Sequence, residues 1–503
     1  MSLLTRAARN FSAQVMIFLI TIADRLLLTG LLIRSWGVED FSDWATILAA
    51  TGLIAMADLG FNIHLGNALS RARERNCRRF FPRLIRFGLF FYVSLATVLL
   101  LGVGLVFAFG DLREWFNLQG RNPGLLFVLL SALQILKVSR SAFSVIYRGM
   151  GEYYRFTLAD MRTMSLSFLA AVAVVALGGS PVTVAIAYIL VEIIFGTAYT
   201  AIHAQRRYGQ IRYRLERPSR QRWRRTARTL RWFGLYQILT YAMQNLPVLI
   251  IAWLGLSGPA LVMFVVQRTL VNVARTVGVN LANATGVELS RIVESQDRTG
   301  YLTGLEILSR VNAALAALMA TGLVTFGGQI VGAWTGRSDL GSITLLGLLL
   351  LPVIALAPAS PLQMLSIYTD RIRPQAIALA VQTGIAIPGA ILAGSHFGIV
   401  GVAGALALAE IIGIAVVAPA LTSRSLGVPY LSLAATSLLV FLLAFSWSGA
   451  TAWLALWMVH VAGLPGLALR LAAWGVVGAL PVLWFGLPAR VRKRLLIHAG
   501  LGR

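Results

Sequence analysis

The residues of this chain that could do chemistry are ionisable side chains placed inside long apolar segments. An ionised group at the centre of a bilayer costs between about 2.5 and more than 10 kcal/mol, so it normally faces water or a partner. Cations at such depth suit an anionic ligand, because a planar guanidinium bonds two phosphate oxygens at once and a lysine adds a point charge. The predicted cationic lining consists of Arg25, Lys137, Arg140, Arg268 and Arg275.

Polar residues accompany these cations at helical spacings of three, four and seven positions, so each set shares one face of a helix. Lipid does not tolerate such faces, and we expect three helices, drawn from both halves of the chain, to line an interior cavity. The predicted polar lining consists of Gln134, Gln237, Tyr241, Gln244, Asn245 and Asn272.

Three carboxylates lie at a similar depth, namely Asp24, Glu192 and Glu410. A desolvated carboxylate can exchange a proton or bind sodium as a cavity alternates between two sides, so these residues are candidates for ion coupling. The alternative is that the embedded cations neutralise them in static pairs. For any single cation, a role in the cavity lining and a static pair are equal interpretations. For the five cations together the cavity lining is favoured, because they outnumber the three carboxylates.

Other charged residues have predicted structural roles. We expect Asp58 to hold the bend at Leu59 and Gly60 or to pair with a loop arginine. Two further pairs, Asp160 with Arg162 and Glu306 with Arg310, are expected to be structural or gating contacts.

The sequence shows little sign of metal or redox chemistry. The single cysteine, Cys77, excludes a disulfide within the chain and a multi-cysteine metal site, and no two of the five histidines have metal-site spacing. We therefore expect no cofactor other than a coupling proton or sodium ion.

The elements that position these residues are predicted to be membrane-spanning helices. Apolar residues make up 58% of the chain and charged residues 13%, whereas an ordinary globular protein carries about 25% charge. About 20 apolar residues cross one bilayer. The predicted fold is an all-α polytopic membrane protein of about fourteen spans, with twelve or thirteen as alternatives. The predicted spans are 12–34, 43–66, 87–109, 123–147, 157–178, 182–204, 233–253, 260–283, 305–327, 342–367, 375–393, 399–421, 430–455 and 466–487.

Cations are distributed very unevenly between the loops. The net charge is +25, and thirty-two Lys and Arg residues lie in loops assigned to one side against three on the other. The positive-inside rule places the first side, and with it both termini, in the cytoplasm. The basic segment from Arg206 to Arg231 is then expected to lie on anionic lipids of the inner leaflet rather than on nucleic acid.

An internal repeat organises the spans. Short matches recur at separations of 218 to 220 residues: Thr21-Ile22-Ala23 with Thr240-Tyr241-Ala242, Leu69-Ser70-Arg71 with Leu289-Ser290-Arg291, and Gly104-Leu105-Val106 with Gly322-Leu323-Val324. Six helices return the chain to its starting side, so the repeat predicts two parallel six-helix lobes around a central cavity, which is a transporter architecture. The predicted parts are an N-lobe at 1–204, a basic linker at 205–232, a C-lobe at 233–421, and two further helices with a basic tail at 422–503.

Three motifs resemble the polysaccharide transporter family of the multidrug/oligosaccharidyl-lipid/polysaccharide (MOP) exporter superfamily, which includes O-antigen and exopolysaccharide repeat-unit flippases. They are the Ser-Trp-Gly-Val-Glu-Asp-Phe segment at 35–41, the Ala-Asp-Leu-Gly-Phe segment at 57–61 and the Asn-Ala-Leu-Ser-Arg segment at 67–71. The resemblance implies the MOP flippase fold and a place in the bacterial inner membrane. It further implies movement of an undecaprenyl-diphosphate-linked oligosaccharide to the outer leaflet, with a polymerase and a chain-length regulator as partners.

Two other functions compete with this interpretation. A membrane enzyme of polysaccharide assembly, such as a polymerase or ligase, needs catalytic groups in a sizeable loop, but the longest outward loops, 110–122 and 328–341, are short and hold no carboxylate-histidine cluster. A small-molecule exporter of the same superfamily is the nearer alternative. A pump for organic cations should prefer an acidic lining, so the positive lining favours an anionic cargo, and a lipid II flippase or teichoic-acid exporter would suit it equally.

The tenth predicted span contains three prolines, Pro352, Pro358 and Pro361. Each removes a backbone hydrogen-bond donor, which is tolerated in a membrane only where a cavity or neighbouring helix satisfies the freed groups. A hinge and tight lobe packing are equal interpretations of this break.

Overall fold

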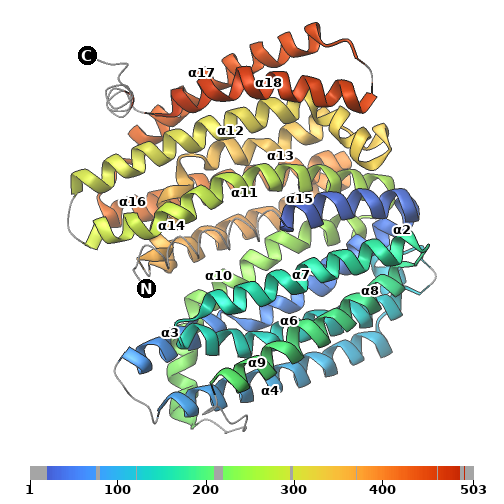
Figure 1. The fold of residues 1–503 in the computed structure, drawn as a ribbon, viewed down its shortest axis with the longest axis vertical. Helices are drawn as coiled ribbons and strands as arrows, with labels where there is room; N and C mark the ends of the chain where they lie inside the picture. The colour runs from blue at the N-terminus through green and yellow to red at the C-terminus, as the bar shows by residue number, and fades with distance from the viewer. Residues whose placement is uncertain are drawn as a thin grey trace. The chain divides into compact units, whose positions relative to one another are not determined.

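The computed structural model describes residues 20–74, 80–120, 122–208, 219–294, 298–369, 371–461, 463–487 and Arg492. All regular secondary structure in these ranges is helical, which confirms the predicted all-α fold (Figure 1). The helices form two compact units, Met1–Val262 and Met263–Arg503, each with its own apolar core. The first eight residues of the first predicted span and the basic tail lie largely outside the described residues.

Within the described residues, nine helices are long and apolar enough to cross a bilayer, and the bent pair α13 and α14 forms a tenth if taken together. The chain is therefore a multi-pass membrane protein. One of the nine segments runs for 53 residues from Ile372 to Arg424, and a positive-φ glycine, Gly398, breaks it where the sequence predicted a turn between two spans. The total of fourteen spans stays a prediction.

The first unit is built from twelve helical segments, in which η marks a 3₁₀ or π-helical stretch. They are η1 (Asp24–Leu28), α2 (Thr29–Gly52), η2 (Leu53–Asp58), α3 (Phe61–Glu74), α4 (Phe80–Phe109), α5 (Leu112–Phe116), α6 (Pro123–Gly149), α7 (Tyr153–Ala176), α8 (Pro181–Val191), η3 (Glu192–Ala198), α9 (Tyr199–Arg207) and α10 (Arg220–Trp253).

Local signals in the sequence explain where several of these helices begin and end. Pro181 opens α8 directly after Ser180, whose Oγ accepts a hydrogen bond from the Thr183 amide at 3.5 Å, a common N-terminal cap. Gly37 has φ of +83° and divides the merged helix α2 at the turn predicted between the first two spans. Only glycine adopts such a backbone angle without steric cost.

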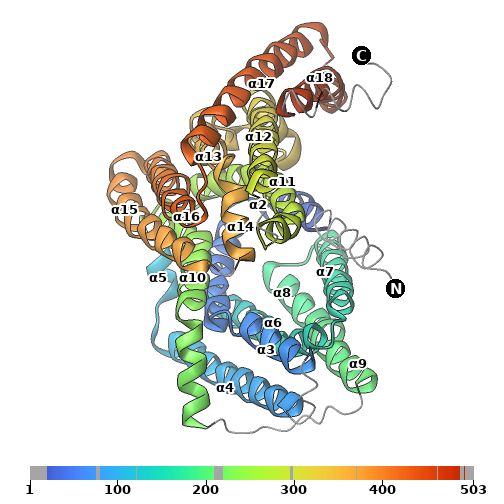
Figure 2. The ribbon, with the colours of Figure 1, turned by 90° about the vertical axis from the view of Figure 1, so that its left-hand side faces the viewer.

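Helix α6 lies at the centre of the first unit, packed against α2, α3, α4, α7 and α8 (Figures 1 and 2). Its C-terminal half shares an aromatic core with α3 and α4, in which the Phe61 ring stacks on Phe91 at 3.8 Å and meets Phe87 edge-on at 5.4 Å. Tyr147 of α6 completes this core. These rings fix α6, which carries two of the embedded cations, against its neighbours.

Helix α10 belongs to the first compact unit, where it packs against α2, η2, α3 and α5. It begins at Arg220, inside the segment predicted as a basic linker. The compact unit thus ends after α10, at Val262. The predicted lobe boundaries at 204 and 233 count transmembrane spans rather than contacts, and they stay predictions.

The second unit contains the remaining segments, together with all but the first turn of α11. They are α11 (Pro259–Glu294), α12 (Arg298–Thr335), η4 (Ser338–Leu340), α13 (Ile343–Leu356), α14 (Ala359–Tyr368), α15 (Ile372–Glu410), η5 (Ile411–Val417), α16 (Ala418–Leu426), α17 (Tyr430–Met458) and α18 (Gly463–Gly486).

Helix α12 is the centre of the second unit and packs against α13, α17 and α18. Its buried face is rich in alanine, including Ala313, Ala314 and Ala317, and small residues let helix backbones approach closely in a membrane. Gly322 of α12 lies under the Trp474 ring of α18, whose indole Nε1 donates to the Ser448 backbone oxygen at 3.2 Å. One tryptophan therefore ties three helices together.

The predicted break in the tenth span is present. Helices α13 and α14 meet at an angle of 61°, and polar side chains satisfy backbone oxygens near the break: Ser360 Oγ donates to the Leu356 oxygen at 2.9 Å and Ser309 Oγ to the Pro358 oxygen at 3.4 Å. The break is thus part of a packed structure, as the hydrogen-bonding demand of the membrane requires.

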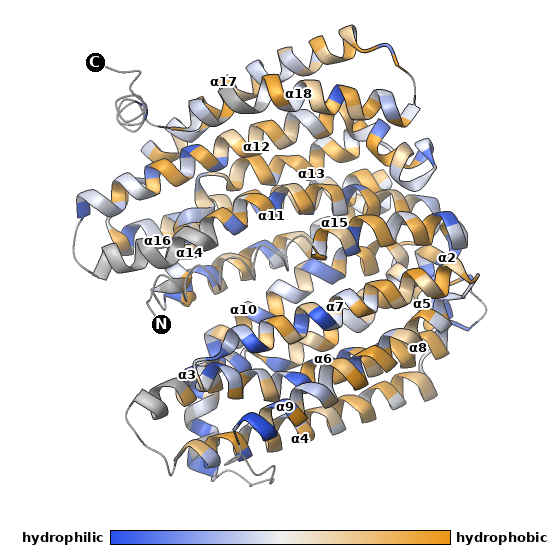
Figure 3. Cartoon of the chain, in the orientation of Figure 1, coloured by the Kyte–Doolittle hydropathy of each residue, from blue (hydrophilic) through white to orange (hydrophobic). Residues whose placement is uncertain are grey.

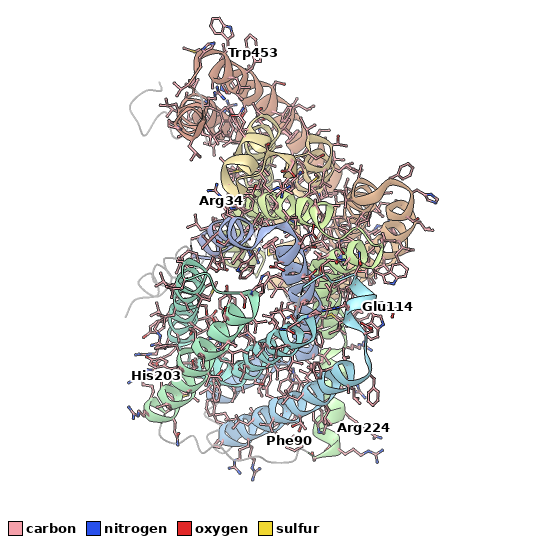
Figure 4. The ribbon with its side chains drawn as sticks, turned by 90° about the vertical axis from the view of Figure 1, so that its right-hand side faces the viewer. Arg34, Phe90, Glu114, His203, Arg224 and Trp453 are labelled. Atoms are coloured by element: carbon pink, nitrogen blue, oxygen red, sulfur yellow. The ribbon has the colours of Figure 1, made fainter. Side chains whose placement is uncertain are left out.

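Apolar side chains cover the outer faces of several helices. Helix α4 and helix α17 are hydrophobic along most of their length (Figure 3), and Trp453 of α17 projects outward with 64% of its surface exposed (Figure 4). Hydrophilic residues interrupt α6, α7 and α11 (Figure 3). The first group of helices suits contact with lipid, and the second group holds the charges.

We expect Gly322→Val to weaken the docking of α18. A Cβ atom at Gly322 would lie 2.6 Å from the Trp474 ring, so the ring must move and lose its hydrogen bond, at a cost of about 1–3 kcal/mol. The melting temperature of the detergent-purified protein should fall by several degrees. Gly328→Val is the control, since a Cβ atom there meets nothing within 4 Å; equal melting temperatures for the two variants would contradict the prediction.

Candidate functional site

Two carboxylates of the first unit meet at Arg140, in the C-terminal half of α6. The Arg140 Nη2 atom donates to Asp160 Oδ1 on α7 at 2.5 Å, and its Nε lies 3.2 Å from Glu192 Oε1 at the start of η3. The Arg140 side chain is 10% exposed, that of Glu192 2% and that of Asp160 32%. Arg140 therefore joins three helices through one ionic triad.

The Glu192 carboxylate is enclosed by its own helix as well. Thr197 Oγ1 donates to Glu192 Oε1 at 3.3 Å, and a Cβ atom on Gly196 would lie 2.4 Å from the same oxygen. Glycine at 196 thus leaves the space that the carboxylate fills. The burial, hydrogen bonding and charge pairing of Glu192 are what a buried carboxylate needs in order to stay ionised.

Lys137 and Asp24 extend the cluster toward the helix that begins the described chain. Lys137 lies one turn before Arg140 on α6, is exposed, and interacts electrostatically with Glu192, Asp160 and Asp24. Asp24 interacts in turn with Lys137 and Arg25. Counting Arg25, this cluster holds three cations and three carboxylates, so its formal charges balance.

The second unit has a smaller cluster on α11 and α15. The Arg275 guanidinium of α11 forms an ion pair with the Glu410 carboxylate at the end of α15, and their side chains are 31% and 15% exposed. Arg268 lies two turns earlier on α11, with its guanidinium 5.7 Å from the Phe264 ring centre. Asn272 lies between the two arginines on the helix.

A small cavity of about 30 Å³ adjoins Arg275, with Gly278, Asn312 and Ser360 among its lining residues. This is room for one or two water molecules. Asn312 is 4% exposed and its Oδ1 atom has no hydrogen-bond partner in the structure. The cavity also touches Ala357 at the break between α13 and α14. It therefore places a buried acceptor and a broken helix beside the guanidinium.

The five predicted cations thus fall into two groups, three in the first unit and two in the second. For Arg140 and Arg275 the structure shows carboxylate pairing of the kind that the alternative interpretation described. The Arg275 side chain remains 31% exposed beside Glu410, and Lys137 is exposed. A single lining to which all five cations contribute stays a prediction.

The predicted polar stripe on α10 faces its neighbours in part. The Asn245 side chain lies against Gly52, where a Cβ atom would approach its Oδ1 to 2.5 Å, and Gln237 lies beside Gly60 at the bend after η2. Gln244 is exposed, while Tyr241 and Gln134 are partly buried. The stripe therefore combines helix packing with accessible polar groups.

The predicted pair of Asp160 with Arg162 is wrong. Residues two apart on a helix do not face one another, and Asp160 binds Arg140 instead. The Arg162 guanidinium lies 3.6 Å from the Tyr199 ring centre and donates to the Phe195 backbone oxygen at 3.1 Å. Asp160 is thus the site residue that reasoning from the sequence missed, although its i, i+2 spacing from Arg162 was a warning.

Two other structural predictions are confirmed. Glu306 and Arg310, four residues apart on α12, form an ion pair at 3.2 Å. Asp58 holds the bend at Leu59 and Gly60, whose φ angles are +50° and +71°: its carboxylate accepts hydrogen bonds from the Tyr92 hydroxyl at 2.6 Å and the Asn62 amide at 3.5 Å.

Each of the three predicted ion-coupling carboxylates lies at the start of a π-helical segment. Asp24 begins η1, Glu192 begins η3, and Glu410 immediately precedes η5. Such segments are rare and frequently mark functional sites, because the wider turn re-aims side chains and shifts backbone hydrogen bonds. No pattern in the sequence indicated them.

The segments that contain Glu192 and Glu410 correspond along their whole length. A positive-φ glycine precedes each one, Gly178 and Gly398, which are 220 positions apart. The glutamates are 218 apart, and η3 and η5 have seven residues each. Both segments carry an arginine in their last helical turn, Arg206 and Arg424, again 218 apart. This agreement supports the internal repeat and makes the two glutamates equivalent.

A separate polar cluster lies at the end of α9, near His203 (Figure 4). Glu152, in the turn between α6 and α7, lies 2.8 Å from Arg155 and 3.2 Å from Arg207 and accepts a hydrogen bond from the Tyr208 hydroxyl at 2.8 Å. Burial by itself would raise the pKa of Glu152, but the hydrogen bonds from Arg207 and Tyr208 and the two positive charges outweigh it and lower the pKa.

In the described part of the chain, no three His, Cys, Asp or Glu side chains gather closely enough to hold a metal ion.

No protein-family model and no curated protein matches this sequence. Solved structures do match it. The structure described as lipid II flippase MurJ in an inward closed conformation has a TM-score of 0.65 and 12% identity, covering 97% of this chain and 99% of its own. An inward-facing multidrug resistance MATE family transporter of the MOP superfamily matches with a TM-score of 0.62 and 15% identity. The match covers 81% of this chain and 94% of that transporter. A mutant of the Vibrio cholerae MATE transporter VcmN matches with a TM-score of 0.57 and 16% identity, and the match covers 83% of this chain and 97% of that transporter. The chain therefore has the MOP fold.

The ionic triad should contribute strongly to stability. Arg140→Ala leaves Glu192 buried without its guanidinium, and breaking a buried pair in this way costs about 3–5 kcal/mol. Arg337→Ala removes an exposed pair with Asp339 at 2.7 Å and should cost at most about 1 kcal/mol. Denaturant unfolding in detergent micelles measures both, and a cost for the Arg140 variant as small as that of the control would show that the triad is not an anchor.

The Glu152 cluster should make stability depend on acidity. Because the pKa of Glu152 is lowered in the folded protein, its contribution is present above the ordinary glutamate pKa of about 4.3 and disappears as pH falls through the lower folded value. The difference in melting temperature between the wild type and Glu152→Gln should therefore be positive at pH 7 and shrink below about pH 4. A constant difference over this range would contradict the assigned contacts.

Proposed function

We propose that this protein is a flippase that moves an undecaprenyl-diphosphate-linked oligosaccharide across the bacterial cytoplasmic membrane by alternating access. The observation that carries the proposal is the presence of five cations, including the accessible Lys137 and Arg275, within apolar helices of a chain with the MOP fold. The similarity to a lipid II flippase over nearly the whole of both chains supports it.

The charge of such a cargo explains why cations are needed. A diphosphate carries about two negative charges, and sinking it unpaired into hydrocarbon would cost tens of kcal/mol. Guanidinium groups remove this obstacle through paired hydrogen bonds to phosphate oxygens. The polyprenyl tail is apolar and stays in lipid, so only the headgroup needs a polar route.

Ion coupling belongs to the same proposal. Asp24, Glu192 and Glu410 are the candidate groups for exchanging a proton or sodium ion, and each one lies at a π-helical irregularity. The orientation proposed from the loop charges places both termini, the segment from Arg206 to Arg231 and the anionic inner-leaflet lipids on the cytoplasmic side. A polymerase and a chain-length regulator are the expected protein partners.

A small-molecule exporter is the second candidate, since MATE transporters are among the similar structures. The two candidate functions require cavity linings of opposite charge. A pump for organic cations would need accessible carboxylates, whereas Glu192 is 2% and Glu410 15% exposed and both are engaged by arginines. Asp160 is 32% exposed but is paired with Arg140. The pairing of these carboxylates with arginines therefore favours an anionic cargo.

A deletion strain tests the function directly. Loss of a flippase should leave lipid-linked oligosaccharide on the inner leaflet, measured by lipid extraction and by access of a membrane-impermeant lectin or periodate label in spheroplasts. The wild-type gene should restore labelling at the outer face, and Lys137→Ala combined with Arg268→Ala should reduce it at least tenfold at equal expression. A matched control combines Arg113→Ala in the five-residue helix α5 with Arg337→Ala directly before η4, two cations outside the proposed cationic lining.

Full rescue by the variant that combines Lys137→Ala with Arg268→Ala would contradict the proposed cationic lining. Unchanged lipid-linked intermediates in the deletion strain, together with increased sensitivity to small toxic cations, would instead favour the exporter.

A further inference from the structure

The two equivalent glutamates have different surroundings. In the first unit, Arg140 is shared between Glu192 and a second carboxylate, Asp160, which holds it at 2.5 Å. If Glu192 loses its charge, Asp160 still retains the guanidinium. Arg140 is also 10% exposed, so little of it can reach a bulky ligand. This pair behaves as a fixed anchor.

In the second unit, Glu410 is the single carboxylate paired with Arg275 among the described residues. The described elements packed against α15 and η5 bring no second carboxylate that could replace Glu410 as the partner of Arg275. Helix α13 contains no acid or base and α14 no charged residue. Arg373 and His396 lie on α15, and Arg424 lies in the last turn of α16. Tyr430 of α17 donates its hydroxyl to the Ala415 oxygen at 2.9 Å.

The charge nearest to Arg275 on its own helix is that of Arg268, which repels it. Neutralising Glu410 would therefore leave Arg275 with a cation nearby and no carboxylate partner in the described chain. A cavity large enough for one or two water molecules, lined by Gly278, Asn312 and Ser360, adjoins Arg275. The Arg275 side chain is 31% exposed, so part of it is accessible.

We propose that Glu410 gates Arg275: the charged carboxylate withholds the guanidinium, and its neutralisation by a proton or a sodium ion releases Arg275 to bind the phosphate groups of the cargo. Glu192 has no such effect, because Asp160 keeps Arg140 in place. The proposal rests on the anionic cargo proposed above and assigns its ion dependence to one of two equivalent positions.

Thermodynamic linkage makes this gate reciprocal. If neutralisation of Glu410 strengthens anion binding, anion binding must favour neutralisation of Glu410 by the same factor. Cargo and coupling ion would then occupy the second unit together. The triad of the first unit would keep its charges paired throughout.

Calorimetric titration of the purified full-length protein in detergent with uridine diphosphate glucose tests the gate, because the charge of this diphosphate diester does not change between pH 5 and pH 8. In sodium-free N-methylglucamine buffer, the affinity of the wild type should rise about tenfold between pH 8 and pH 5, a typical coupling factor. Glu410→Gln should bind at the higher affinity throughout and lose the pH dependence. Glu306→Gln, which breaks another Glu–Arg pair of the same unit, is the matched control and should behave as the wild type.

Glu192→Gln should keep the pH dependence that Glu410→Gln loses, although the two positions are equivalent in the repeat. Arg275→Gln provides a second test if Glu410→Gln does not fold: its binding should be weak and independent of pH. Adding sodium chloride at pH 8 distinguishes the ion, since an increase in affinity assigns the gate to sodium and its absence assigns it to the proton. Size-exclusion profiles verify folding of every variant.

An affinity for uridine diphosphate glucose that is independent of both pH and sodium in the wild type would overturn the gate while leaving the proposed cargo intact. Loss of the pH dependence in Glu192→Gln and its retention in Glu410→Gln would overturn the assignment to the second unit. Absence of binding of this diphosphate diester in the wild type and in Glu410→Gln would contradict the anionic cargo itself, and the gate with it.

Discussion

The constraint on which this structure depends is the cost of an ionised group in hydrocarbon. Charges within the spans are placed where another charge or a polar backbone group can meet them. Arg140 joins α6, α7 and η3 because two carboxylates from different helices converge on it, and Arg275 joins α11 to α15 through Glu410. The same contacts that satisfy the charges therefore fix how the helices pack, so the candidate site and the fold have one physical origin.

Irregular backbone obeys the same rule. The π-helical segment η3 leaves backbone oxygens that side chains satisfy: Arg162 donates to the Phe195 oxygen and Thr200 Oγ1 to the Gly196 oxygen. Serines do the same at the break between α13 and α14. The π-helical segments adjoin Asp24, Glu192 and Glu410, and the break between α13 and α14 adjoins the cavity at Arg275. Irregular helix geometry and embedded charges therefore occur together.

The repeat supplies similar helices to both units but different chemistry. The segments around Glu192 and Glu410 agree in their glycine turn, their π-helical stretch and their terminal arginine. Their arginine partners come from non-equivalent helices, α6 in one unit and α11 in the other. Arg140 is 10% exposed and has two carboxylate partners, whereas Arg275 is 31% exposed and has one among the described residues. The two equivalent glutamates therefore have unequal surroundings.

The sequence by itself determined the all-helical membrane fold, the turns at Gly37 and Gly398, the break near Pro358 and the bend held by Asp58. Hydropathy, glycine and proline are local signals, so these features can be found without knowing which helices are neighbours. The tertiary structure alone decided that Asp160 binds Arg140 rather than Arg162, that the three carboxylates coincide with π-helical segments, and that two equivalent glutamates have unequal partners. These outcomes depend on which helices are neighbours and on how each one is rotated, and a single sequence does not encode such distances in its spacing.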